Sequence, residues 1–81
     1  MNIKEFTEYL VKSIVSDPDM VKVSEFGGEE DTIILEVIVT DIDRGVVIGK
    51  AGRTAKAIRT LVQAHAYLKG LKKVKINIDS F

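Results

Sequence analysis

The spacing of apolar residues changes several times along this chain of 81 residues, and the order of these changes limits the folds open to it. Residues 3 to 15 place apolar side chains every three or four positions, which is typical of an amphipathic helix. Residues 20 to 26 alternate and residues 32 to 40 form a β-branched run, so both segments are predicted strands. The turn at residues 27 to 31 predicts an antiparallel hairpin. Its second strand is apolar on both sides apart from Glu36, so we expect it at the centre of the sheet.

The second half of the chain repeats the change from helix to strand. A short helix that begins after a polar cap and ends at Ile48 is predicted. Its glycine and its β-branched residues give this helix a low intrinsic stability. Residues 53 to 68 predict a longer helix, which a basic last turn and Gly70 end. Alternation from residue 73 to residue 79 predicts a last strand.

Together these elements predict an α+β fold in the order helix, strand, strand, helix, helix, strand. A crossover that contains two helices places the last strand parallel to the second one, because such connections are right-handed. We therefore expect a three-stranded mixed sheet with helices packed on one face. The other face is left open, and Lys22, Lys73 and Lys75 are candidates to line it.

Length and composition exclude several classes of protein. A chain of 81 residues, 46% apolar and 30% charged, predicts one domain over residues 1 to 81. It has no cysteine and one histidine, so we expect neither a metal site nor a cofactor. No apolar stretch has the length of a signal or membrane segment, which predicts a cytoplasmic location.

The charges are balanced in number but segregated along the chain. Twelve basic and twelve acidic residues give zero net charge, which disfavours long-range attraction to a nucleic acid. Acidic residues dominate positions 25 to 43, whereas every charged residue from Arg44 to Lys75 is basic. The neutral total therefore conceals a basic second half.

The segment Gly49-Lys50-Ala51-Gly52 lies between the two predicted helices of that basic half. Two glycines permit a tight turn with positive φ and let another chain approach the backbone closely. The following helix points its free N–H groups and the positive end of its dipole at the loop, and Lys50 and Arg53 add charged donors. A phosphate is the natural occupant of such a loop.

The helix after this loop has a basic side and an unusually wide apolar side. Drawn at about 100° per residue, the basic side continues from the loop; it holds Arg53, Lys56, Arg59, Thr60 and Gln63. The apolar arc spans about 200°, wider than a core-facing stripe needs; it holds Ala55, Ala57, Ile58, Leu61, Val62, Ala64 and Leu68. Part of this arc is a candidate surface for self-association.

Other interpretations of the same residues are less specific. Gly45 to Ala51 resembles a Walker A loop, but it has three residues between its glycines instead of four and lacks the Ser or Thr that binds magnesium. A connector whose glycines serve only packing remains an alternative. His65 lies in the apolar arc and is predicted to be structural, and Tyr9 and Tyr67 are predicted at the rim of the core.

Residues 47 to 58, Val-Ile-Gly-Lys-Ala-Gly-Arg-Thr-Ala-Lys-Ala-Ile, resemble the core of KH domains. The predicted order of elements is similar to the type II KH fold of prokaryotes. Since the resemblance covers the whole chain, the sequence is identified as a member of the bacterial single-KH-domain family KhpA. The resemblance implies a narrow groove for about four unpaired nucleotides.

The resemblance also assigns roles to particular residues. Gly49, Lys50, Ala51 and Gly52 clamp the RNA backbone, and Arg53 is an adjacent phosphate contact, with Lys56 further along the same helix. The groove floor is assigned to Val47, Ile48, Ile58 and strand residues 33 to 39. Relatives commonly carry Lys or Arg at the position of Val46; either Arg44 supplies this charge here or the phosphate contact is weaker.

What the resemblance implies for function is binding of single-stranded RNA in post-transcriptional regulation, as an RNA chaperone. It also implies a homodimer, or pairing with a larger KH-containing protein linked to cell elongation, division and shape. A protein-interaction adaptor with incidental RNA contact is the alternative, which the neutral charge favours and the intact loop disfavours. The sequence contains no acid–base pair or metal constellation typical of an enzyme.

Overall fold

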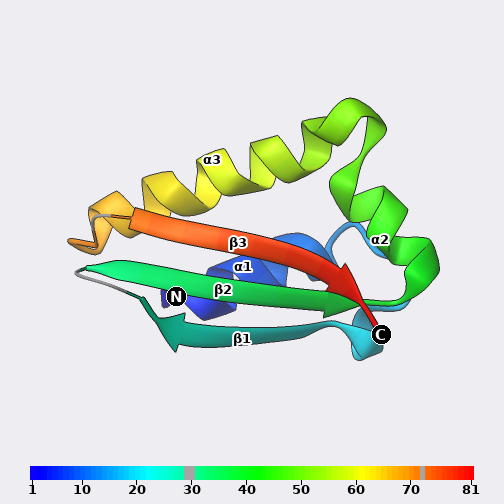
Figure 1. Ribbon diagram of the computed structural model, residues 1–81, viewed down its shortest axis with the longest axis horizontal. Coiled ribbons are helices and arrows are strands. Elements are labelled where there is room, and N and C mark those ends of the chain that lie inside the picture. Colours follow the sequence, from blue (N-terminus) through cyan, green and yellow to red (C-terminus); the bar gives the residue numbers. More distant parts are fainter. Residues whose placement is uncertain (29–30, 72) are drawn as a thin grey trace.

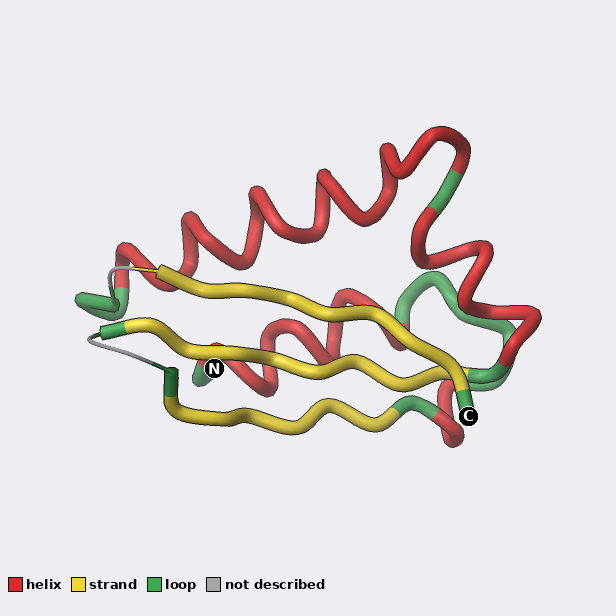
Figure 2. Tube along the Cα trace, viewed as in Figure 1, coloured by secondary structure: helices red, strands yellow, loops and turns green. Residues whose placement is uncertain are grey.

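The computed structural model describes residues 1–28, 31–71 and 73–81, so Glu29 and Glu30 of the predicted turn lie outside the described residues. The elements, in order, are α1 (Ile3–Lys12), η1 (Pro18–Met20), β1 (Lys22–Gly27), β2 (Thr32–Val39), α2 (Asp41–Ile48), η2 (Lys50–Gly52), α3 (Arg53–Leu68) and β3 (Lys73–Ser80). Apart from the two short 3-10 turns, this is the predicted order (Figures 1 and 2). The α+β fold is confirmed.

The sheet has the strand order β1-β2-β3, which confirms β2 as the central strand. β1 pairs with β2 in antiparallel fashion, and Val23 lies opposite Val37. β3 pairs with β2 in parallel, and Leu35 lies beside Ile76. The crossover through α2 and α3 therefore returns the chain in the predicted direction, and β3 is an edge strand (Figure 1).

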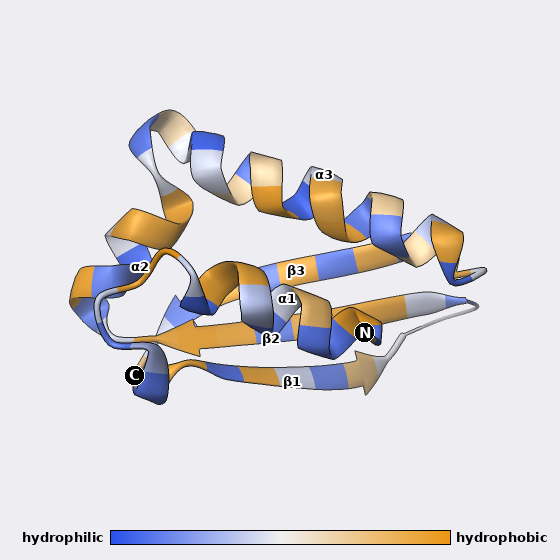
Figure 3. Ribbon diagram, turned by 180° about the vertical axis from the view of Figure 1, so that it is seen from behind, coloured by the Kyte–Doolittle hydropathy of each residue, from blue (hydrophilic) through white to orange (hydrophobic). Residues whose placement is uncertain are grey.

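The helices cover one face of the sheet (Figure 3). Alternate residues of β2 point into this layer and are buried, because successive side chains of a strand point to opposite faces. The largest fully buried apolar side chains are Leu35, Val11, Val37, Val39, Val47 and Val62. Within the described ranges, no helix combines the length and the apolar content needed to cross a membrane.

Helix α1 begins as its sequence favours but ends earlier than predicted. Asn2 and Glu5 form a capping box, in which the backbone N–H of Glu5 donates to Asn2 Oδ1 at 2.8 Å. The prediction that the helix continues to residue 15 was wrong. The Ile14 N–H donates to the Val11 carbonyl, three residues back, so the last turn tightens and the chain leaves the helical path.

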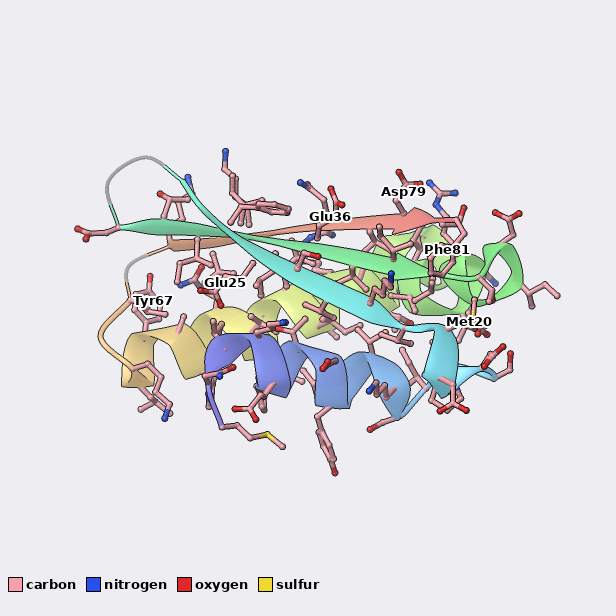
Figure 4. The ribbon with its side chains drawn as sticks, turned by 90° about the horizontal axis from the view of Figure 1, so that it is seen from below. Met20, Glu25, Glu36, Tyr67, Asp79 and Phe81 are labelled. Atoms are coloured by element: carbon pink, nitrogen blue, oxygen red, sulfur yellow. The ribbon has the colours of Figure 1, made fainter. Side chains whose placement is uncertain are left out.

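The second face of the sheet is open, as predicted. Lys22, Lys73 and Lys75 are all exposed on it, and the exposed ring of Phe26 shares this face. Figure 4 shows Glu36 and Asp79 projecting from the same face, on the side opposite the helices. The sheet therefore presents a mixed polar and apolar surface to solvent.

Candidate functional site

Helix α2, which leads into the glycine loop, is held in place by a buried carboxylate. Asp43 is 1% exposed, and its carboxylate accepts hydrogen bonds from the Ser16 N–H at 2.9 Å, the Ser16 hydroxyl at 2.7 Å and the Asp17 N–H at 3.0 Å. The backbone and side-chain donors of Ser16 are the main reason that the pKa of Asp43 lies below its ordinary value. These bonds compensate for the weak helix propensity of α2 and fix its position against the end of α1.

The loop at residues 49 to 52 adopts a backbone that favours glycine. Gly49 and Gly52 have φ values of 77° and 74°, which confirms the predicted positive φ. Ala51 between them also lies in the left-handed region, with φ 56° and ψ 27°. The Gly49 N–H donates to the Gly45 carbonyl at 2.9 Å and ends α2, while the Gly52 N–H donates to the Gly49 carbonyl at 3.1 Å. The loop is therefore one tight, internally bonded turn.

Gly49 is also required by close packing against the start of α3. A Cβ atom at this position would overlap the Thr54 hydroxyl and would lie 2.9 Å from the Thr54 backbone nitrogen. Because a backbone atom cannot move aside cheaply, any larger residue would push the loop away from α3. Sequence reasoning missed the role of Thr54, which only the three-dimensional contact reveals.

The loop stands at the surface, where α2 and α3 meet (Figure 1). Lys50, Ala51 and Arg53 are exposed, and the two glycines are half-buried. None of the described side chains caps the start of α3, which is 16 residues long. The Arg53 N–H donates to the Lys50 carbonyl, so the positive dipole end and the remaining N–H groups of the first turn are what this exposed, basic turn can offer to an anion.

The basic side of α3 runs beside β3. Arg59 Nη2 donates to the Ile76 carbonyl at 3.4 Å, and the Val74 N–H donates to Gln63 Oε1 at 3.1 Å. Between helix and strand lies a hollow of about 500 Å³, which we call the α3 hollow; its lining includes Lys56, Arg59, Gln63, Tyr67 and Val74. The predicted basic track therefore continues into an open depression.

The structure divides the predicted apolar floor residues into two groups. Val47 and Ile58 are buried in the core, so they support the loop from inside. Ile48 is half-buried, and exposed Arg44 lies one helical turn before it, on the same side of α2. Strand residues 33 to 39 supply the centre of the core, while the strand that borders the α3 hollow is β3.

The aromatic side chains of the helices have different environments. His65 is half-buried and stacks on Phe6 with ring centroids 4.4 Å apart, and its Nε2 lies 2.9 Å from the Met1 carbonyl oxygen. This contact joins α3 to α1 and confirms a structural role. The prediction that Tyr9 and Tyr67 lie at the core rim was wrong, because both are exposed.

Comparison with protein families matches residues 4–78 to the KhpA/KhpB KH domain. A protein of Clostridium perfringens named RNA-binding protein KhpA is 53% identical over 76 residues, which cover 94% of this chain and 99% of that protein. A protein of Chlamydia trachomatis with the same name is 46% identical over 77 residues, which cover 95% of this chain and 94% of that protein. The likeness therefore extends over nearly the full length of each chain.

Solved structures of Era share the fold. The Era of Aquifex aeolicus bound to GDP and aluminium fluoride superimposes with a TM-score of 0.72 at 16% identity. An Era complex with nucleotides 1506–1542 of 16S ribosomal RNA gives 0.73, also at 16% identity. Each match covers 98% of this chain but only 30% of the Era chain. At this identity the likeness concerns the fold alone.

Proposed function

The chain belongs to the KhpA/KhpB family of KH domains, and on that basis we propose that it binds short single-stranded RNA at the loop of residues 49 to 52. The observation that carries this proposal is the exposed loop with positive φ at the uncapped start of α3. Named relatives are RNA-binding proteins rather than enzymes, and this favours RNA as the ligand. Since RNA is the ligand, we place this activity in the cytoplasm.

In the proposed complex, phosphates lie over the loop and the RNA strand continues along α3. The N–H groups at the start of α3 donate to a phosphate, and the flexible ammonium group of Lys50 and the guanidinium group of Arg53 add charged hydrogen bonds. Further phosphates meet Lys56 and Arg59 at the α3 hollow. Half-buried Ile48 offers an apolar contact for a base, with Arg44 beside it. One such site takes about four nucleotides.

The test replaces both residues between the glycines by aspartate, in the double variant Lys50→Asp/Ala51→Asp. Aspartate tolerates the left-handed conformation of Ala51, so the fold should persist, while two negative charges occupy the phosphate position. We expect fluorescence anisotropy with an unstructured RNA to show a loss of affinity of at least about tenfold. The reason is that repulsion between the two aspartates and a phosphate costs more than about 1.4 kcal/mol of binding free energy.

The matched control is Lys50→Asn/Ala51→Asn, which has nearly the same shape without the negative charges. It should lose less affinity than the aspartate variant, and circular dichroism of both variants should match that of the wild type. Equal affinity of the aspartate variant and the wild type would remove the loop from the mechanism.

We further propose that the chain works as a homodimer, or with a larger KH-containing partner, in post-transcriptional regulation linked to cell elongation and division. Four apolar residues of α3 form an exposed stripe at spacings of four, three and four residues: Ala57, Leu61, Ala64 and Leu68. Leu61 is 49% exposed and Leu68 is 86% exposed, an unusual cost for a small domain. The exposure of this stripe supports a dimer in which a second helix covers it, and it also supports the alternative function of an interaction adaptor.

A further inference from the structure

The open face of the sheet has two halves of different character. Near the β1–β2 hairpin, the register aligns Phe26 with Ile34 and Ile34 with Lys75 in one row across the three strands. The acidic side chains Glu36 and Asp79 lie further along the strands, away from the hairpin (Figure 4). Among the described residues, the half of the face next to the hairpin therefore carries two lysines and apolar side chains, and exposed Asp31 lies in the turn beside it.

This half of the face contains a hollow of about 710 Å³, which we call the sheet hollow. It is lined by Gly27, Gly28, Thr32, Ile34, Lys73 and Lys75. Both lysines are exposed, and the Phe26 side chain beside the hollow is 51% exposed. Within residues 1–28, 31–71 and 73–81, no ion pair involves Lys73 or Lys75. The two ammonium groups are thus available to an outside anion.

The chemistry of this hollow matches single-stranded nucleic acid. Two residues on one face of a strand lie about 6.6 Å apart, so Lys73 and Lys75 present two separate positive charges along β3. An exposed aromatic ring and a branched apolar side chain lie beside them and offer faces against which a base can stack. Charged groups next to an aromatic platform are the usual composition of a site for single strands.

We propose that the sheet hollow is a second contact site for single-stranded RNA. This hollow binds the nucleotides that extend beyond the α3 hollow. This inference rests on the proposed function of the loop. It predicts that the chain distinguishes RNA by length, because a strand of about four nucleotides is accommodated by the loop and α3 alone.

The two hollows lie on the two faces of β3. Val74 lines the α3 hollow, whereas its neighbours Lys73 and Lys75 line the sheet hollow, since successive residues of a strand point to opposite faces. β3 is an edge strand, so only its width separates the two sites (Figure 1). Tyr67 lines the α3 hollow at the end of α3 farthest from the loop, where the RNA would cross β3 to reach the sheet hollow (Figure 4).

The experiment measures how RNA affinity depends on the length of the oligomer and on the two lysines of the open face. Unstructured uridine oligomers of about four and about twelve nucleotides are titrated against the wild type and Lys73→Ala/Lys75→Ala, with anisotropy as the readout at several salt concentrations. We expect the double variant to bind the long oligomer at least about fivefold more weakly and the short one unchanged. The salt dependence for the long oligomer should flatten by about 1.4 in log–log slope, because two phosphate contacts are lost at about 0.7 each.

Two further variants separate the causes. Phe26→Ala should weaken binding of the long oligomer without changing its salt slope, because a ring contributes stacking rather than counterion release. Lys22→Ala is the matched control, since it removes an exposed lysine from the other end of the same face and should leave both oligomers unaffected.

Each outcome decides between the two sites. If Lys73→Ala/Lys75→Ala binds both oligomers like the wild type, or weakens both equally, the sheet hollow is not a second RNA site. If the aspartate variant of the loop binds the short oligomer normally while Lys73→Ala/Lys75→Ala loses the long one, the proposed function of the loop fails and the sheet hollow stands. Cross-linking of two copies through this face without RNA would assign it to self-association instead.

Discussion

At the scale of single residues, Gly49 combines two requirements that no other residue type satisfies together. Its φ of 77° lies in the left-handed region, and its missing side chain leaves room for Thr54. Ala51 adopts a similar φ of 56° although it carries a side chain, so the loop stores some backbone strain at its exposed tip. Backbone demands and the proposed binding of an anion thus converge on the same four residues.

Replacing Gly49 by alanine should destabilise the protein by about 1–3 kcal/mol, because the new Cβ meets the Thr54 backbone and the residue keeps a positive φ. Urea denaturation followed by circular dichroism measures this difference. The matched control is Gly45→Ala in α2, where an added Cβ meets no atom of the described residues within 4 Å. That variant should gain about 0.5–1 kcal/mol from helix propensity. Equal stability of both variants would contradict the assigned role of Gly49.

At the scale of elements, the local pattern predicted most of the fold. Periodicity identified α1, β1 and β3, because amphipathic spacing is a property of neighbouring residues. A β-branched run identified β2, and a polar cap indicated α2. The positive φ values of Gly49 and Gly52 were also predictable, because glycine tolerates them, whereas the positive φ of Ala51 was not predicted. Helix α2 was predicted to have a weak helix propensity. Its stability comes from hydrogen bonds that Asp43 accepts from Ser16 and Asp17, which lie 27 and 26 positions earlier in the chain. No local pattern contains such a contact.

The neighbours of the candidate site were harder to predict for the same reason. Residues 33 to 39 were assigned to its floor, but in β2 these residues point alternately into the helix layer and onto the open face, and β3 is the strand that borders the α3 hollow. The bonds of Arg59 and Gln63 to β3 span 17 and 11 residues. The exposure of Tyr67 was not predicted either, because this residue lies outside the apolar arc and lines the α3 hollow with Lys56 and Arg59.

Asp43 should make the position of α2 dependent on acid pH. The pKa of this carboxyl lies below its ordinary value of 3.8 in the folded state, so its ionised form stabilises the fold above that pH. This stability is lost as the pH falls from 3.8 through the lower folded-state pKa. Asp43→Asn should be less stable than the wild type at pH 7 and should lack this acid-dependent loss. Urea denaturation from pH 7 to pH 2 measures both effects.

The exposed Asp41 on the same turn of α2 provides the control for this experiment. Asp41→Asn should keep the stability of the wild type at pH 7 and its decline in acid. A wild-type pH profile in Asp43→Asn would show that the bonds to Ser16 and Asp17 do not hold α2.

At the scale of the whole molecule, three separate surfaces are proposed to bind RNA or a second copy of the chain. The glycine loop lies at one end of α3, the apolar stripe of Ala57, Leu61, Ala64 and Leu68 lies along that helix, and the sheet hollow lies on the opposite layer. A dimer through the stripe would leave the loop and the sheet hollow accessible, whereas Ala64 also lines the α3 hollow, so the stripe and the RNA path meet at that residue. Two copies would then present two loops to one RNA and raise the effective affinity by avidity.

Leu61→Lys should convert the proposed dimer to a monomer, because it places a charge at the centre of the apolar stripe. Sedimentation velocity measures the change in mass. The control Tyr9→Lys alters an exposed apolar side chain of similar exposure on α1 and should leave the dimer intact. A dimer that survives Leu61→Lys would exclude this stripe as the interface.

We propose that the backbone turn at residues 49 to 52 holds a phosphate of single-stranded RNA. Nuclear magnetic resonance titration of the amide-labelled protein with an RNA of about four nucleotides tests it directly, because each backbone N–H reports separately. We predict that the largest shifts occur at the amides of the loop and the first turn of α3. Saturable binding with unchanged amide signals from residues 49 to 54 would contradict the account.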